Sequence, residues 1–120
     1  MQKGFLDQMQ LLFTVILFGC LVGDSAHAQV NYLALGDSFT SGVGVRNNEA
    51  FPRVLVREWS ALGCSVTLKN KAWGGRTARG VAQEQLKELT VFKPDLVTLG
   101  IGANDIRLGI SLPDYLYWVR

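Results

Sequence analysis

The stretch LALGDSFTSG, residues Leu33–Gly42, joins the end of an apolar run to a loop of small residues. The run Val30–Leu35 is short and mostly apolar, as in a central strand covered on both faces, and Gly36 ends it. Asp37 and Ser38 follow directly. A serine at the end of a buried strand is a candidate nucleophile, and its hydroxyl reacts well only when a base removes its proton. The stretch therefore raises two questions: which fold places this serine there, and which residue is its base.

Helical and strand patterns alternate after Gly42. The sequence predicts a helix over 51–62, a half-covered strand near a sheet edge over 64–69, a helix over 82–92 and a strand over 96–99. Residues 112–120 are typical of the opening of another helix. The apolar face of the helix over 82–92 is expected to contain Ala82, Leu86, Leu89 and Phe92.

Strands that alternate with helices favour parallel strands and right-handed crossovers, hence a three-layer α/β/α sheet of which this chain holds the first three strands. In open sheets of this kind, ligands bind at the carboxyl ends of the strands. Three loops that are rich in glycine follow the three predicted strands, at 36–38, 74–75 and 102–105. We expect these loops to converge on one site.

Residues in the three loops suit acyl transfer through a serine. Ser38 would be the nucleophile, and the tetrahedral intermediate needs preorganised hydrogen-bond donors. Gly75 can offer an unobstructed backbone N–H and Asn104 a side-chain amide, so with the Ser38 N–H they form a candidate oxyanion hole. Each loop by itself is also compatible with a simple turn or a helix cap. The ordered set, one after each strand, favours the catalytic interpretation.

The segments LALGDSFTSGVG, NKAWGGRTARG and GIGANDI resemble the first three blocks of the SGNH (GDSL-type) hydrolases. That family contains serine esterases, lipases, thioesterases and carbohydrate deacetylases on a flavodoxin-like α/β/α fold. The resemblance implies that Ser38 is the catalytic serine and that Gly75 and Asn104 serve the oxyanion hole, with Gly74 as a close rival of Gly75. It also implies a small-molecule, carbohydrate or lipid ester as substrate and no cofactor. Phe39 stands where the family name has leucine.

The sequence departs from the family in one respect. SGNH hydrolases carry an Asp-x-x-His block that supplies the general base and the acid that orients it, and this sequence contains no such block. Its one histidine is His27. We therefore expect residues 29–120 to be the N-terminal part of a truncated SGNH domain that is inactive alone. The alternative from a different class is an inactive pseudoenzyme or ligand-binding module on the same fold.

Residues 1–28 are typical of a secretory signal sequence. The apolar segment 11–22 is too short to span a bilayer, and Ala26 and Ala28 are the small residues that signal peptidase requires. Cleavage after Ala28 predicts a secreted or periplasmic protein that starts at Gln29. The alternative is a lipoprotein anchored at Cys20.

The composition is that of one globular domain, with 48% apolar and 18% charged residues. A net charge of +2 with scattered basic residues argues against nucleic-acid binding. A nucleotide site is also disfavoured, because the loop after the first strand has neither the third glycine of a dinucleotide fingerprint nor a Gly-Lys-Ser/Thr element. Without histidine after residue 28, no metal site based on histidine is expected. Trp73, Arg76 and Arg79 either line a substrate pocket or, as the sequence favours, pack beneath the loop (Trp73) and lie in solvent (the arginines).

Overall fold

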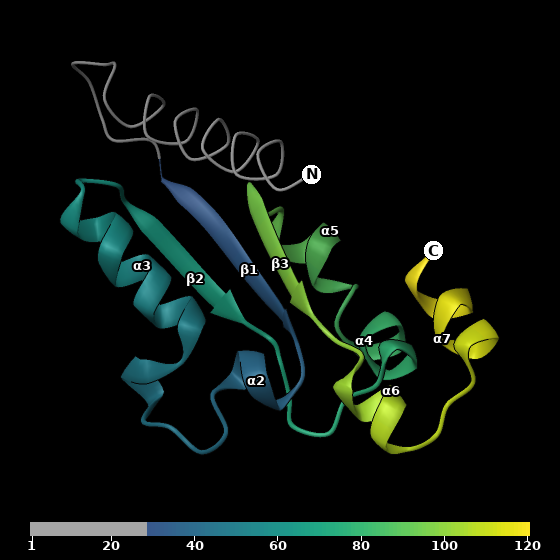
Figure 1. The fold of residues 1–120 in the computed structure, drawn as a ribbon. Coiled ribbons are helices and arrows are strands. Elements are labelled where there is room, and N and C mark those ends of the chain that lie inside the picture. The colour runs from purple at the N-terminus through teal and green to yellow at the C-terminus, as the bar shows by residue number, and fades with distance from the viewer. Residues whose placement is uncertain (1–28) are drawn as a thin grey trace, which may run out of the picture.

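A computed structural model describes residues 29–120 (Figure 1). Three parallel strands form one sheet: β1 (Val30–Gly36), β2 (Val66–Asn70) and β3 (Leu96–Gly100), in the order β2-β1-β3. The predicted α/β fold with parallel strands and with the half-covered strand at an edge is confirmed. The predicted signal sequence lies outside the described residues.

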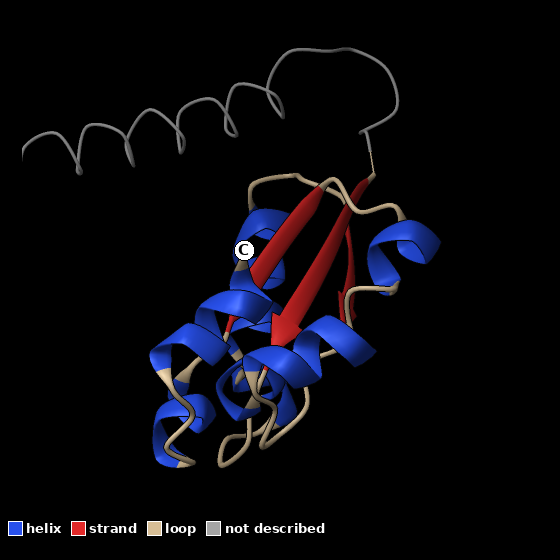
Figure 2. Cartoon of the chain, turned by 90° about the vertical axis from the view of Figure 1, so that its right-hand side faces the viewer, coloured by secondary structure: helices blue, strands red, loops and turns tan. Residues whose placement is uncertain are grey.

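Helices lie on both faces of the sheet (Figure 2). On one face, Trp59 of α3 (Phe51–Ala61) packs against Tyr32, with 6.1 Å between ring centroids. On the other, Glu88 of α5 (Glu88–Phe92) forms an ion pair with Lys69, the register partner of Leu33. Because Tyr32 and Leu33 are consecutive, their side chains point to opposite faces, and so α3 and α5 cover opposite faces. The helical elements are α2 (Ser38–Ser41), the 3₁₀ turn η1 (Asn47–Glu49), α3 (Phe51–Ala61), α4 (Ala78–Glu84), α5 (Glu88–Phe92), α6 (Ala103–Arg107) and α7 (Leu112–Val119).

The core is centred on β1. Tyr32, Leu33 and Ala34 are fully inaccessible and Leu35 is nearly so, as expected for a central strand with a layer on each side. Burial raises the pKa of Tyr32, although its hydrogen bond to Thr98 partly opposes this. Burial on β1 thus holds the strand that leads directly into Ser38.

The prediction of a single helix over 82–92 is wrong in two ways. The segment forms two helices, α4 and α5, separated at Gln85–Lys87, and its buried side chains are not the predicted apolar set. The inward-facing positions are instead Ala78, Val81, Gln85 and Glu88. Gln85 is drawn inward because its amide hydrogen-bonds both backbone groups of Gly36, at 2.9 Å each. A pattern of apolar residues cannot reveal a helix face that is held by a buried amide.

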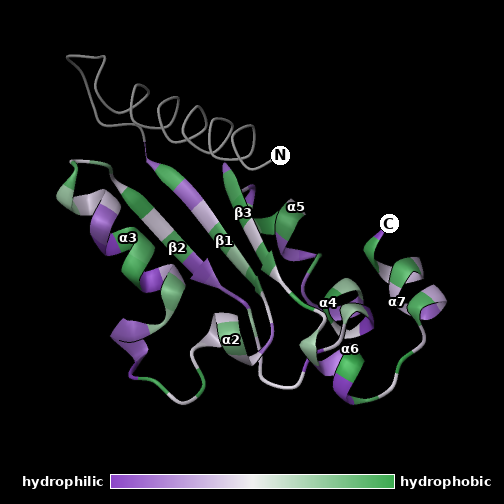
Figure 3. Cartoon of the chain, viewed as in Figure 1, coloured by the Kyte–Doolittle hydropathy of each residue, from purple (hydrophilic) through white to green (hydrophobic). Residues whose placement is uncertain are grey.

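The outer edge of β3 is open within the described residues. Its other edge pairs with β1, and the side chains of Val97 and Leu99 are 40% and 52% exposed. Figure 3 shows apolar residues on β3 at this edge of the sheet. Between residues 29 and 120, no helix combines the length and apolar character that a membrane crossing needs.

Gly36 packs so tightly that it tolerates no side chain. A Cβ there would lie 2.3 Å from Gly100 O and 2.6 Å from Thr40 Oγ1, and the residue has φ of +143°. Gly100 is constrained in the same place, because a Cβ on it would lie 2.9 Å from Thr40 Oγ1. This close approach lets the start of α2 sit directly against the ends of β1 and β3.

We expect Gly36→Ala to lower the free energy of unfolding by roughly 2–4 kcal/mol, through backbone strain and overpacking together. Gly44→Ala is the matched control, because Gly44 has φ of +90° but no atom within 4 Å of its would-be Cβ. Urea unfolding of both variants measures the difference. Equal losses in the two variants would show that the contact with Gly100 and Thr40 does not constrain the fold.

Candidate active site

Ser38 begins the short helix α2 at the carboxyl end of β1. Asp37 is the N-cap: its Oδ1 accepts the Phe39 N–H at 3.0 Å, and its own N–H donates to Gly100 O at 3.2 Å. Neither the Ser38 N–H nor its Oγ has a hydrogen-bond partner within residues 29–120. The cap therefore presents Ser38 with a hydroxyl and an N–H that are both available.

The Gly74–Gly75 loop forms a tight turn beside Ser38. The turn closes through the Arg76 N–H to Trp73 O at 3.4 Å, and Gly75 occupies its third position with φ of +80°, where glycine is favoured. A Cβ on Gly74 would lie 3.9 Å from Ser38 Cβ. The N–H groups of Gly74 and Gly75 have no acceptor within the described part of the chain. Two unpaired donors thus adjoin the serine.

Asn104 lies in the first turn of α6, the helix of the third loop, and is buried. Its Nδ2 donates to Asp37 Oδ2 at 3.3 Å and to Arg76 O at 3.0 Å. Since an amide nitrogen carries two hydrogens, both already have acceptors. Asn104 ties the three loops together, and it can donate to a substrate oxygen only when one of these contacts is released.

The structure thus brings together the three residues predicted from the sequence, Ser38, Gly75 and Asn104, at the carboxyl ends of the strands. They lie in α2, in the turn after β2 and in α6, and Figure 1 shows α2 and α6 at this end of the sheet. The structure also shows two buried carboxylates to which sequence reasoning assigned no role, Asp37 and Asp105. Their only sequence signal is position, since each adjoins a predicted site residue. Their roles depend on backbone N–H groups that sequence patterns do not display.

A family model for the GDSL-like lipase/acylhydrolase family matches residues 34–118, which contain all three loops. The chain belongs to this family. An arylesterase from Vibrio mimicus is 32% identical over 94 residues, which cover 78% of this chain and 46% of that protein.

Solved structures agree with this assignment. AlinE4, an SGNH-hydrolase family esterase, is 25% identical with a TM-score of 0.70 over 79% of this chain and 51% of that one. The psychrotrophic esterase EstA from Pseudoalteromonas sp. shares the fold at 24% identity, with a TM-score of 0.67 over 74% and 49% of the two chains. The chain spans about half the length of these relatives.

In this SGNH hydrolase chain, residues 29–120 provide no histidine. Asp37 is the carboxylate next to Ser38 in sequence, and its two oxygens already accept hydrogen bonds from Phe39 and Asn104. The described residues therefore bring together the Ser38 hydroxyl and unpaired N–H groups, and they contain no imidazole.

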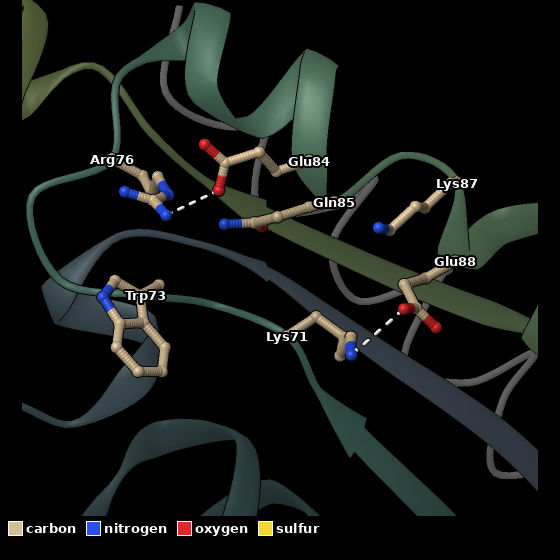
Figure 4. A pocket seen from close by; sticks show the side chains of 7 residues that line it. All are labelled: Lys71, Trp73, Arg76, Glu84, Gln85, Lys87 and Glu88. Atoms are coloured by element: carbon tan, nitrogen blue, oxygen red, sulfur yellow. Dashed lines mark ion pairs between the residues drawn. The ribbon is translucent and has the colours of Figure 1, made fainter.

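A cavity of about 310 Å³ lies beside the Trp73–Arg76 turn (Figure 4). Ion pairs cross its wall from Arg76 to Glu84 and from Lys71 to Glu88. Hydrogen bonds from Lys69 and Lys71 hold the pKa of Glu88 below its ordinary value. The lining residues are Lys71, Trp73, Arg76, Glu84, Gln85, Lys87 and Glu88.

The favoured interpretation of Trp73 as packed beneath the loop is wrong, because its side chain lines this cavity and is 68% exposed. The arginines are also engaged rather than simply solvated. Arg76 pairs with Glu84, and the Arg79 guanidinium lies 5.7 Å from the centre of the Trp118 ring.

Proposed function

We propose that this chain carries the nucleophile and the oxyanion hole of a secreted ester hydrolase. The observation that supports this is the convergence of unpaired groups at one sheet edge: the Ser38 hydroxyl, the Ser38 N–H and the Gly74 and Gly75 N–H groups. Unpaired donors that a rigid loop already orients suit an oxygen that becomes negative during reaction. The esterase activity named for the relatives supports the same reaction class.

The reaction proceeds through an acyl-serine. Ser38 Oγ bonds to the ester carbonyl carbon as its proton passes to a base. The carbonyl π electron pair moves onto the carbonyl oxygen, which accepts hydrogen bonds from the Ser38 and Gly75 N–H groups. Asn104 joins these donors after its Nδ2 leaves Asp37 Oδ2, the longer of its two contacts, while it keeps its hydrogen bond to Arg76 O. Collapse of the intermediate breaks the ester C–O bond, and the departing alcohol takes the proton. Water then gives a proton to the base and bonds to the acyl carbon. The bond from that carbon to Ser38 Oγ breaks, the carboxylic acid leaves and Oγ regains its proton from the base.

The base must come from outside residues 29–120 if it is an imidazole, as in the family. We propose that residues 29–120 are the N-terminal part of a longer hydrolase domain, which agrees with relatives about twice as long. The second candidate is a ligand-binding module without catalysis. Its support is the absence of histidine from residues 29–120 together with the engaged amide of Asn104.

Imidazole added in excess should restore ester hydrolysis that depends on Ser38, because it supplies in solution the base that residues 29–120 do not contain. We expect the wild-type chain to exceed Ser38→Ala by at least about tenfold in this assay with p-nitrophenyl acetate. Ser41→Ala is the matched control, since Ser41 lies in the same helix but donates its hydroxyl to Ser38 O. Equal rates for wild type and Ser38→Ala would favour the binding module.

A comparison of two variants, Gly75→Ala and Gly74→Ala, tests which of the two glycines is the oxyanion donor. Gly75→Ala strains a backbone with φ of +80°, so we expect a fall in kcat of about tenfold or more. Gly74→Ala meets only Val43 Cγ2 at 3.6 Å and Ser38 Cβ at 3.9 Å, so it is expected to raise KM for larger acyl groups and to keep kcat. Steady-state kinetics with imidazole present measure both constants. The reverse pattern would assign the donor to Gly74.

We also propose that the protein is exported, with cleavage after Ala28, on the strength of the apolar segment and small residues in 1–28. When the protein is expressed in a bacterial host with residues 1–28 retained, we expect the exported form to begin at Gln29. N-terminal sequencing of the exported protein measures this. A lipid-modified N-terminus at Cys20 would instead establish the lipoprotein alternative.

A further inference from the structure

The Trp73–Arg76 turn, here called the oxyanion turn, is held by three contacts that flank its unpaired N–H groups. Before it, the Trp73 N–H donates to Gly36 O at 3.1 Å. After it, Arg76 O accepts from Asn104 Nδ2 at 3.0 Å, and the Ala78 N–H lies 3.0 and 3.1 Å from the two carboxylate oxygens of Asp105. Gly74 and Gly75 are the unanchored residues between these points.

Two consecutive residues of α6 therefore grip the segment that follows the turn. Asn104 holds a carbonyl and Asp105 holds an N–H two residues later, so the pair fixes both the position and the direction of that backbone. Asp105 is only 3% exposed, and a buried carboxylate that accepts from one backbone N–H makes a strong contact that is costly to lose.

The contact of Asp105 falls where the turn becomes helix α4. Thr77 is the N-cap of α4, and its hydroxyl accepts the Gly80 N–H, which leaves the Ala78 N–H for Asp105. Arg76 is tied to the same helix through its ion pair with Glu84 (Figure 4). Movement of α4 would thus be passed on to the turn, and Asp105 is the link from α6 that resists it.

We propose that Asp105 is a positioning residue for the oxyanion hole: by holding the Ala78 N–H it fixes the direction of the Gly75 N–H relative to Ser38. The inference rests on the proposed esterase function for its catalytic consequence, though not for the geometry. An oxyanion donor must be oriented before the reaction, because a small misplacement forfeits much of its effect. Asp105 itself touches no reacting atom.

The test compares Asp105→Ala, which removes the acceptor, with Asp105→Asn, which keeps an oxygen that can accept from Ala78. Asp95→Ala is the matched control, because Asp95 Oδ2 also accepts a backbone N–H, that of Asn31 at 2.8 Å, but at the amino ends of the strands, away from the turn. Each chain is treated with a fluorophosphonate probe in the presence of imidazole, and the rate and affinity constants of Ser38 labelling are separated. Amide ¹⁵N relaxation of Gly75 is measured in parallel.

Asp105→Ala is expected to lower the maximal labelling rate by about 10-fold to 100-fold with the probe affinity unchanged, and to raise the mobility of Gly75. Asp105→Asn should recover most of the rate, and Asp95→Ala should change neither quantity. Unchanged labelling and unchanged Gly75 mobility in Asp105→Ala would overturn the proposal.

Two further results separate the possible failures. If Asp105→Ala does not fold, relaxation in the wild-type chain decides: a Gly75 amide as mobile as that of Gly44, which lies in an open loop, overturns the proposal. If Ser38→Ala is labelled as fast as wild type, the esterase proposal fails, while Gly75 mobility still tests the role of Asp105.

Discussion

The site depends on the hydrogen bonds of the Gly36 backbone. Its N–H donates to Gln85 Oε1, and its carbonyl accepts from both Gln85 Nε2 and the Trp73 N–H. One residue at the end of β1 thereby holds both Gln85, where α4 and α5 separate, and Trp73, the first residue of the Trp73–Arg76 turn. Because Gly100 and Thr40 press against the same residue, no side chain can replace the glycine hydrogen there. The serine is placed by what surrounds the residue two positions before it.

Near Gly36, some polar groups of the site already have hydrogen-bond partners and others have none within the described residues. Three buried side chains form hydrogen bonds with backbone groups or with each other: Asp37, Asn104 and Asp105. Buried polar groups that are fully hydrogen-bonded make a loop rigid, whereas unpaired ones would be costly. The N–H groups of Gly74 and Gly75 remain available in the described chain because the turn is anchored only on its two sides. Rigid anchoring beside unpaired donors is the arrangement that electrostatic stabilisation of an oxyanion requires.

The two incomplete features of residues 29–120 lie in different places. One is chemical, since Ser38 has no imidazole base within them. The other is structural, since β3 presents an open edge with Val97 and Leu99 partly exposed. Unpaired apolar edges favour association with further strands. Both features agree with relatives about twice as long, and a single longer domain would account for both.

The sequence by itself determined the alternation of strands and helices, the order of the three glycine-rich loops and the identity of Ser38, Gly75 and Asn104 as candidates. These were predictable because the burial of a strand and the glycines of a turn are visible in a short stretch of sequence. The carboxyl ends of parallel strands also lie on the same side of the sheet, so the loops after them come together. Only the tertiary structure decided that Gln85 splits the predicted helix, that both hydrogens of Asn104 are already engaged, that Trp73 faces a cavity and that Asp105 grips the Ala78 N–H. Each of these depends on a backbone or side-chain group more than ten residues away, and no periodicity of apolar residues records where such a partner lies.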